Sequence, residues 1–140
     1  MLARIRKAME EREGGFTLIE LLVVVIIIGI LAAIAIPVFL NQRQKGWDAQ
    51  AKSDLRNMAT AEETILGESG SYTANVFASG GSPSLEGNGF RRSPDSSNYL
   101  AVPNALDPAY GYCLSLTSKS GRIFIYTSDT GYPALAAAPC

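Results

Sequence analysis

Residues 16–40, FTLIELLVVVIIIGILAAIAIPVFL, constrain this chain more than any other part of its sequence. No charged residue occurs from Leu21 to Leu40. About 20 apolar residues, at a rise of roughly 1.5 Å each, match a hydrocarbon layer of about 30 Å, so the segment predicts a transmembrane helix. A helix of this length on a soluble domain would have a polar face, and this one is apolar on all sides.

Glu20 is the one acidic residue inside this apolar block. An ionised carboxylate costs about 2.5–3.5 kcal/mol at the centre of a bilayer on insertion scales, and less at the interface. Taken alone, Glu20 fits either the rim of an ordinary membrane anchor or a functional position. The flanking residues favour the second interpretation.

The preceding segment, Met1–Gly15, is rich in basic residues and ends in a pair of glycines. A secretory signal is cleaved after small residues that lie beyond its apolar run. Here the small residues come first, so cleavage at Gly15 would remove the basic residues and keep the helix. The basic residues Arg4, Arg6, Lys7 and Arg12 favour a cytoplasmic N-terminus, which places everything after Leu40 outside.

The stretch from Gly15 to Glu20, GFTLIE, resembles the processing site of type IV prepilins, the class III signal, with Phe16 as the new N-terminus. Gly29 and Pro37 also fall where type IV pilins commonly carry residues that weaken or kink the helix. The resemblance is close from Gly15 to about Gln50 and loose beyond it.

The resemblance implies a structural subunit of a type IV pilus filament. A prepilin peptidase would cut between Gly15 and Phe16 and N-methylate Phe16. An assembly ATPase and a platform protein would then move the single-pass membrane subunit into a helical homopolymer at the cell surface, with Glu20 needed for assembly. A pseudopilin of a type II secretion system shares the motif, and a monomeric, signal-anchored binding domain is a third hypothesis.

Composition argues against most enzymatic functions and gives no support for a strongly basic, nucleic-acid-binding domain. The 140 residues suffice for one small domain and an anchor, and the formal net charge is −1. The chain contains no histidine, which is the commonest general base and metal ligand. No metal-ligand spacing, phosphate-binding loop or nucleophile–base pair is recognisable, so we expect no enzyme, no cofactor and no metal site. Whether the chain binds nucleic acid stays open.

Residues 41–66 predict an amphipathic continuation of the helix into water. An apolar stripe follows the helical spacing, formed by Trp47, Ala51, Leu55, Met58, Ala59, Ile65 and Leu66. The charged residues Asp48, Lys52, Asp54 and Arg56 are expected on the opposite, solvent-facing side. Gly67 and Gly70 are expected to end the helix.

The remaining residues predict a small β domain. Residues 67–108 are rich in Gly and Ser and predict a loop region, with Asn98–Val102 as a possible strand. Residues 109–140 predict a hairpin and a C-terminal region bounded by cysteines, because Tyr110, Tyr112, Leu114 and Leu116 alternate with small or polar residues before a turn. The tail from Gly131 onward is expected to be irregular. The expected fold class is α+β, with the long helix packed on a small antiparallel sheet.

The two cysteines, Cys113 and Cys140, both lie on the exported, oxidising side of the predicted membrane segment. They predict an intramolecular disulfide, with free or intermolecular thiols as the alternative. This arrangement resembles the disulfide-bounded C-terminal region of many type IV pilins, although here the second cysteine is the last residue.

Overall fold

The computed structural model describes residues 15–77, 83–104, 106–107 and 109–140. Its one long helix, α2 (Leu18–Ser69), is followed by four strands: β1 (Ser96–Pro103), β2 (Tyr112–Ser118), β3 (Ile123–Thr127) and β4 (Ala134–Ala136). The chain divides between Leu40 and Asn41 into two units, called here the apolar segment (residues 16–40) and the head (residues 41–140). Residues 1–14, most of the predicted leader, lie outside the described part.

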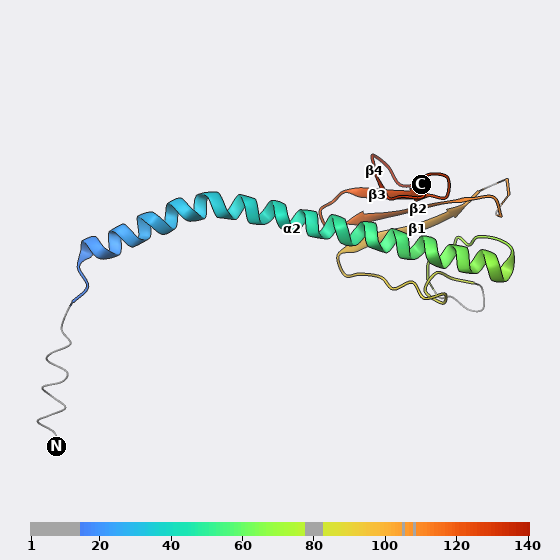
Figure 1. Cartoon of the computed structure of the whole chain (residues 1–140), viewed down its shortest axis with the longest axis horizontal. Helices are drawn as coiled ribbons and strands as arrows, with labels where there is room; N and C mark the ends of the chain where they lie inside the picture. Colours follow the sequence, from blue (N-terminus) through green and yellow to red (C-terminus); the bar gives the residue numbers. More distant parts are fainter. Residues whose placement is uncertain (1–14, 78–82, 105, 108) are drawn as a thin grey trace, which may run out of the picture. The chain divides into compact units, whose positions relative to one another are not determined.

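The four strands of the head form one antiparallel sheet in the order β1-β2-β3-β4, and the head part of α2 packs along it (Figure 1). The β2–β3 hairpin turns at Ser118–Arg122, where Gly121 adopts a φ of 83° that glycine accepts without strain. Strand β1 includes the predicted Asn98–Val102 strand. The α+β architecture expected from the sequence is confirmed.

The core of the head lies between α2 and the sheet. On the helix, Ala51, Leu55 and Met58 have no exposed surface, as the predicted stripe requires. On the sheet, Tyr112, Leu114 and Leu116 are buried, because alternate residues of a strand face the same side. Tyr110 does not join them: β2 begins only at Tyr112, and the Tyr110 side chain is 79% exposed.

Two expectations are wrong: Gly67 does not end the helix, although Gly70 does, and the tail is not wholly irregular. Helix α2 runs past Gly67 to Ser69, and Gly70 follows it with a φ of 77° and a hydrogen bond from its N–H to the carbonyl of Leu66. Gly70 is therefore the residue that terminates the helix. The tail, expected to be irregular, contains the short strand β4, because Ala134–Ala136 pair with the free edge of β3.

The predicted solvent-facing position of Asp48 is also wrong, because Asp48 is only 6% exposed. Its carboxylate accepts hydrogen bonds from Ser118 Oγ at 2.9 Å, from Ser120 Oγ and from Arg122 Nη1 at 2.9 Å. Burial alone would raise the pKa of Asp48, but these hydrogen bonds and the Arg122 charge hold the pKa below its usual range. Asp48 thereby ties the β2–β3 turn to α2.

Asp54 is the second helix carboxylate that the sequence interpretation misplaced. It is 1% exposed and accepts hydrogen bonds from Ser93 Oγ at 2.6 Å and from the Tyr99 hydroxyl at 2.9 Å. Gln50, one helical turn earlier, donates a third hydrogen bond of 2.9 Å. Asp54 therefore fixes the start of β1 and the segment before it to the helix.

Glu62 is fully buried on the same helix, and its Oε2 accepts a hydrogen bond of 3.0 Å from the backbone N–H of Thr73. No described residue donates a hydrogen bond to its Oε1. The sequence contained a signal for two of these carboxylates. Asp48 comes three residues before Ala51, and Glu62 lies between Met58 and Ile65, so both follow the 3–4 spacing of the buried apolar residues. A buried carboxylate at such a position needs a partner from another segment, and sequence spacing cannot name that partner.

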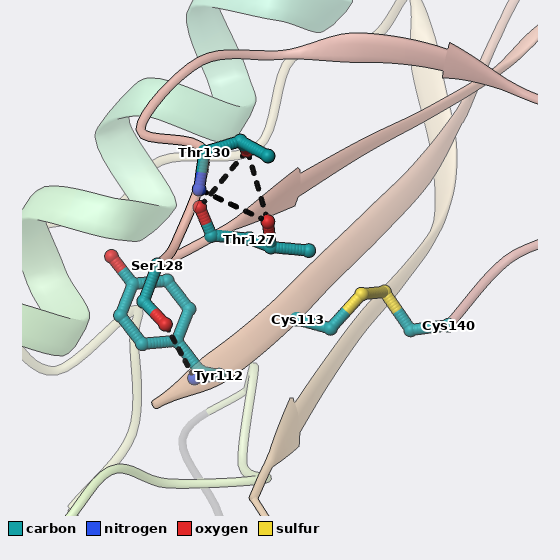
Figure 2. The surroundings of a disulfide bond; sticks show 6 residues. All are labelled: Tyr112, Cys113, Thr127, Ser128, Thr130 and Cys140. Atoms are coloured by element: carbon teal, nitrogen blue, oxygen red, sulfur yellow. Dashed lines mark hydrogen bonds between the residues drawn. A yellow bond between two sulfur atoms is a disulfide. The ribbon is translucent and has the colours of Figure 1, made fainter. Parts of the chain in front are cut away.

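Cys113 and Cys140 are joined in a disulfide, with Cα atoms 6.0 Å apart. Figure 2 shows that Tyr112 and Cys113 leave β2 on opposite sides, with Tyr112 toward α2. Because β3 separates β4 from β2, the tail must return across β3 to reach Cys113. The tail therefore lies over the sheet face that α2 does not cover.

Glu62 generates a prediction about pH. Burial, opposed by the Thr73 hydrogen bond and reinforced by the Glu63 charge, raises the pKa of Glu62 from 4.5 to about 7. The folded head therefore binds this proton more tightly than the unfolded chain, so the stabilisation is complete below pH 4.5 and disappears as the pH rises through about 7. Glu62→Gln stays neutral and retains an acceptor for Thr73.

We expect Glu62→Gln to match the unmodified chain in unfolding free energy near pH 4.5 and to exceed it at pH 8, by on the order of 3 kcal/mol. Urea unfolding of both proteins across this range measures the difference. Parallel pH profiles for the two proteins would contradict the assignment.

The disulfide generates a second prediction. It closes a loop with a sequence separation of 27 residues, which corresponds to about 3–4 kcal/mol in the chain-entropy model. We expect Cys140→Ser to lower the unfolding free energy by roughly this amount and to make the tail after Thr130 sensitive to protease. Thiol labelling of the denatured, unreduced parent protein is the control, and two reactive thiols there would refute the bond.

Candidate functional site

The predicted cleavage bond, Gly15–Phe16, lies in backbone that precedes the helix. Gly15, Phe16 and Thr17 have no regular secondary structure, and α2 begins at Leu18. The Phe16 side chain is 80% exposed, and a Cβ added at Gly15 would meet no atom within 4 Å. A protease needs exposed, non-helical backbone, and this bond satisfies that requirement.

Thr17 and Glu20 form a reciprocal cap at the start of α2. The Thr17 backbone N–H and hydroxyl donate to Glu20 Oε2 at 2.9 Å and 2.7 Å. The Glu20 backbone N–H in turn donates to Thr17 Oγ1 at 3.3 Å. This is the capping-box arrangement, which satisfies backbone donors at a helix N-terminus that have no partner within the helix.

The cap places a negative carboxylate at the positive end of the helix dipole. Both Thr17 hydrogen bonds end on Oε2, so Oε1 can accept from a further donor. Sequence reasoning treated Glu20 without its partner and missed Thr17. The signal was present, because Thr17-Leu18-Ile19-Glu20 is a T-x-x-E pattern directly before an apolar run.

The apolar segment presents its side chains outward. Its large hydrophobic residues, from Phe16 to Leu40, are between 46% and 81% exposed. Helix α2 contains an 18-residue window that is apolar and long enough to cross a membrane, and none of that window is buried. Monomeric soluble proteins rarely expose a continuous apolar surface of this size. The segment therefore requires lipid or other protein surfaces around it.

Helix α2 continues through both Gly29 and Pro37. Proline removes one backbone hydrogen bond at its position. A Cβ added at Gly29 would meet nothing within 4 Å, so no contact within the described chain requires glycine there. Gly29 weakens the helix by about 1 kcal/mol relative to alanine, and a glycine also allows a second helix to approach closely.

The described residues contain no cluster of three or more His, Cys, Asp or Glu side chains suited to a metal ion. Both cysteines are engaged in the disulfide between β2 and the tail. The geometry of the site therefore consists of an exposed, non-helical junction at Gly15–Phe16, a capped helix start and an exposed apolar helix.

The family model described as the prokaryotic N-terminal methylation motif matches residues 12–36. The chain is 41% identical to the type IV major pilin of Myxococcus xanthus over 74% of this chain and 49% of that protein. It is also 40% identical to the type II secretion system core protein G of Dickeya chrysanthemi, over 34% of this chain and 31% of that protein.

The chain spans about half the length of several relatives that it matches, with 49% to 55% of those proteins covered. The match to the type IV wide pilus major component of Thermus thermophilus is more extensive. Identity is 33% over 84% of this chain and 83% of that protein, which includes the head as well as the helix. The chain therefore belongs to the type IV pilin family.

Proposed function

We propose that this chain is the precursor of a structural subunit of a type IV pilus filament. The observation that carries the proposal is the exposed apolar helix that begins directly after an accessible Gly15–Phe16 bond. Cleavage at this bond leaves the helix as the N-terminus of the mature chain. Relatives named as major pilins, matched over both helix and head, support the same function.

Filament formation accounts for the apolar segment better than a permanent membrane anchor does. An anchor needs apolar length alone, which explains neither the acidic residue of the Thr17–Glu20 cap nor a glycine at position 29 that weakens the helix. Lipid and neighbouring helices are similarly apolar, so transfer from one to the other costs little hydrophobic free energy. Small residues such as Gly29, Ala32 and Ala33 allow helices to pack closely once they leave the lipid.

The proposal also gives the chain an orientation and partners. The leader stays in the cytoplasm, the apolar segment crosses the membrane, and the head lies outside, where the disulfide forms. A prepilin peptidase cuts after Gly15 and methylates Phe16. An assembly ATPase and a platform protein then add the subunit to the helical homopolymer.

The pseudopilin of a type II secretion system is the second candidate. The match to a secretion core protein supports it, but it covers only 34% of this chain. The match to the Thermus thermophilus pilus component covers 84% of the chain and favours the pilus subunit.

Processing provides the first test. We expect the assembled protein to begin at Phe16 and to carry one N-methyl group, because the bond before Phe16 is exposed and the helix after it must be retained. The intact mass of the chain from isolated filaments measures both changes. A chain that still begins at Met1, or one cut beyond Leu40, would end the pilin hypothesis.

Glu20 provides a second test of the proposal. Cleavage creates a positive amine at Phe16, also in a poorly solvated position. Burying either charge alone is costly, and pairing them recovers much of that cost. Glu20 lies four residues after Phe16, so a pair between the carboxylate of one subunit and the amine of the next would help to set their axial stagger.

Because Glu20 both caps the helix and carries a charge, three variants can separate the two roles. Glu20→Ala removes both cap and charge, Glu20→Gln retains an acceptor for Thr17 without the charge, and Thr17→Ala removes the cap partner but leaves the charge. We expect all three to be cleaved after Gly15. We expect only Thr17→Ala to form filaments, counted by electron microscopy at equal subunit level.

Normal filament numbers for Glu20→Gln would contradict the charge-pairing mechanism. Loss of filaments in Thr17→Ala at the same extent as in Glu20→Ala would assign the role of Glu20 to capping alone.

A further inference from the structure

Trp47 lies at the centre of a cluster of positive side chains in the head. The Arg43 guanidinium is 5.0 Å from the centre of the indole ring, and the Lys119 ammonium is 5.5 Å from it. Arg43 is one helical turn before Trp47, whereas Lys119 comes from the β2–β3 turn. The fold therefore gathers cations from two distant parts of the sequence around one aromatic side chain.

The Asp48 hydrogen bonds hold this arrangement in place. Asp48 directly follows Trp47 and binds Ser118 and Arg122 on either side of Lys119. Lys119 in turn pairs with Asp95 at 3.1 Å. We call Arg43, Trp47, Lys119 and Arg122 the cationic patch.

The patch has more positive than negative charge. Its two neighbouring acids, Asp48 and Asp95, are each paired with one cation, Arg122 and Lys119. The third cation, Arg43, forms no ion pair with the residues that the structure describes. Gathering like charges is unfavourable unless an anion neutralises them, so the patch is suited to an anionic surface.

The position of the patch in the chain indicates which anion. Arg43 and Trp47 come three and seven residues after Leu40, where the apolar segment ends. At about 1.5 Å per helical residue, they lie roughly 4–10 Å past that end, which is the depth of lipid headgroups beside a hydrocarbon core of about 30 Å. Tryptophan and cations are the residues typical of that layer, where anionic lipid attracts nearby cations.

The orientation rule does not explain these cations. Basic residues close to a membrane segment are favoured on the cytoplasmic side, and the proposed topology puts Arg43 and Lys45 on the other side. Their presence there requires a compensating interaction. We propose that the cationic patch binds the headgroups of anionic phospholipids. This contact would hold the head against the non-cytoplasmic leaflet of the membrane that the apolar segment crosses, until the subunit is assembled.

A second copy of the chain is the alternative occupant, since Glu62, Glu63 and Glu68 lie near the other end of α2. Two of these acids are already engaged. Glu62 is buried, and Glu63 accepts a hydrogen bond of 3.2 Å from the Tyr72 hydroxyl. The lipid surface therefore fits the patch better. The inference rests on the proposed function, because it needs the apolar segment to lie in a bilayer before assembly.

Trp47 is the single tryptophan of the chain, so its fluorescence reports directly on the patch. The experiment uses the full-length chain, reconstituted at low density in phosphatidylcholine vesicles with or without about 30% phosphatidylglycerol. A nitroxide on the lipid headgroup quenches the tryptophan in proportion to its proximity. We expect stronger quenching in the anionic vesicles, and we expect the increase to vanish at about 1 M salt, where charges are screened within about 3 Å.

Arg43→Gln should remove about a third of the increase in quenching that phosphatidylglycerol causes, because one of the three patch cations is lost. Arg56→Gln is the matched control. It is exposed on the same helix but lies about 20 Å further along the axis than Arg43, and it should leave the increase unchanged.

Equal quenching in both vesicle types would overturn the inference, as would equal effects of the patch and control variants. If the increase in Trp47 quenching instead grows with protein density in the membrane, the patch is assigned to a contact between copies of the chain. Filament assembly and the mass of the mature chain are measured separately. If filaments form but Trp47 quenching does not depend on anionic lipid, the lipid contact is rejected and the proposed function stays intact.

Discussion

The apolar surface of residues 16–40 is the constraint on which the rest of this molecule depends. Its large side chains are at least 46% exposed, and no described part of the chain covers them. Water cannot solvate so large an apolar surface without a free-energy penalty proportional to its area. Only a bilayer or other protein surfaces of similar apolarity can remove this penalty. Membrane residence and self-association are two solutions of the same physical problem.

The head, which packs on the second half of the same helix, must be stable with only a small core. Its sheet is small, and two of its four strands, β3 and β4, have five and three residues. Three buried carboxylates of α2, Asp48, Asp54 and Glu62, each bind a different segment of the head. The disulfide attaches the tail on the opposite face of the sheet. Apolar burial, carboxylate hydrogen bonds and one covalent link together compensate for the small core.

Glu20 joins local structure to assembly. Within one chain it caps α2 through Thr17, which satisfies backbone donors at the helix start. In the proposed filament the same carboxylate pairs with the amine of a neighbouring subunit. The two roles are compatible, because the cap uses one carboxylate oxygen and leaves the other available. A capped start also keeps the helix ordered at the residue where cleavage exposes the new terminus.

The long helix, the apolar segment, the GFTLIE junction, the β2–β3 hairpin and the apolar stripe on α2 could all be predicted from the sequence. These features depend on local composition and periodicity, which the chain carries wherever it folds. The capping box was present in the sequence as well, in the T-x-x-E spacing of Thr17 and Glu20.

The tertiary structure alone decided the partners of the helix carboxylates. Asp54 lies 39 residues from Ser93, and Asp48 lies 74 residues from Arg122. Helical spacing can indicate that such an acid lies on the buried side, as for Asp48, but it cannot name the partner, and both acids were assigned to solvent. Strand β4 likewise forms only because β3 presents a free edge to three residues with no strong strand preference of their own. Periodicity determines which face of an element is buried, and the packed fold determines what that face meets.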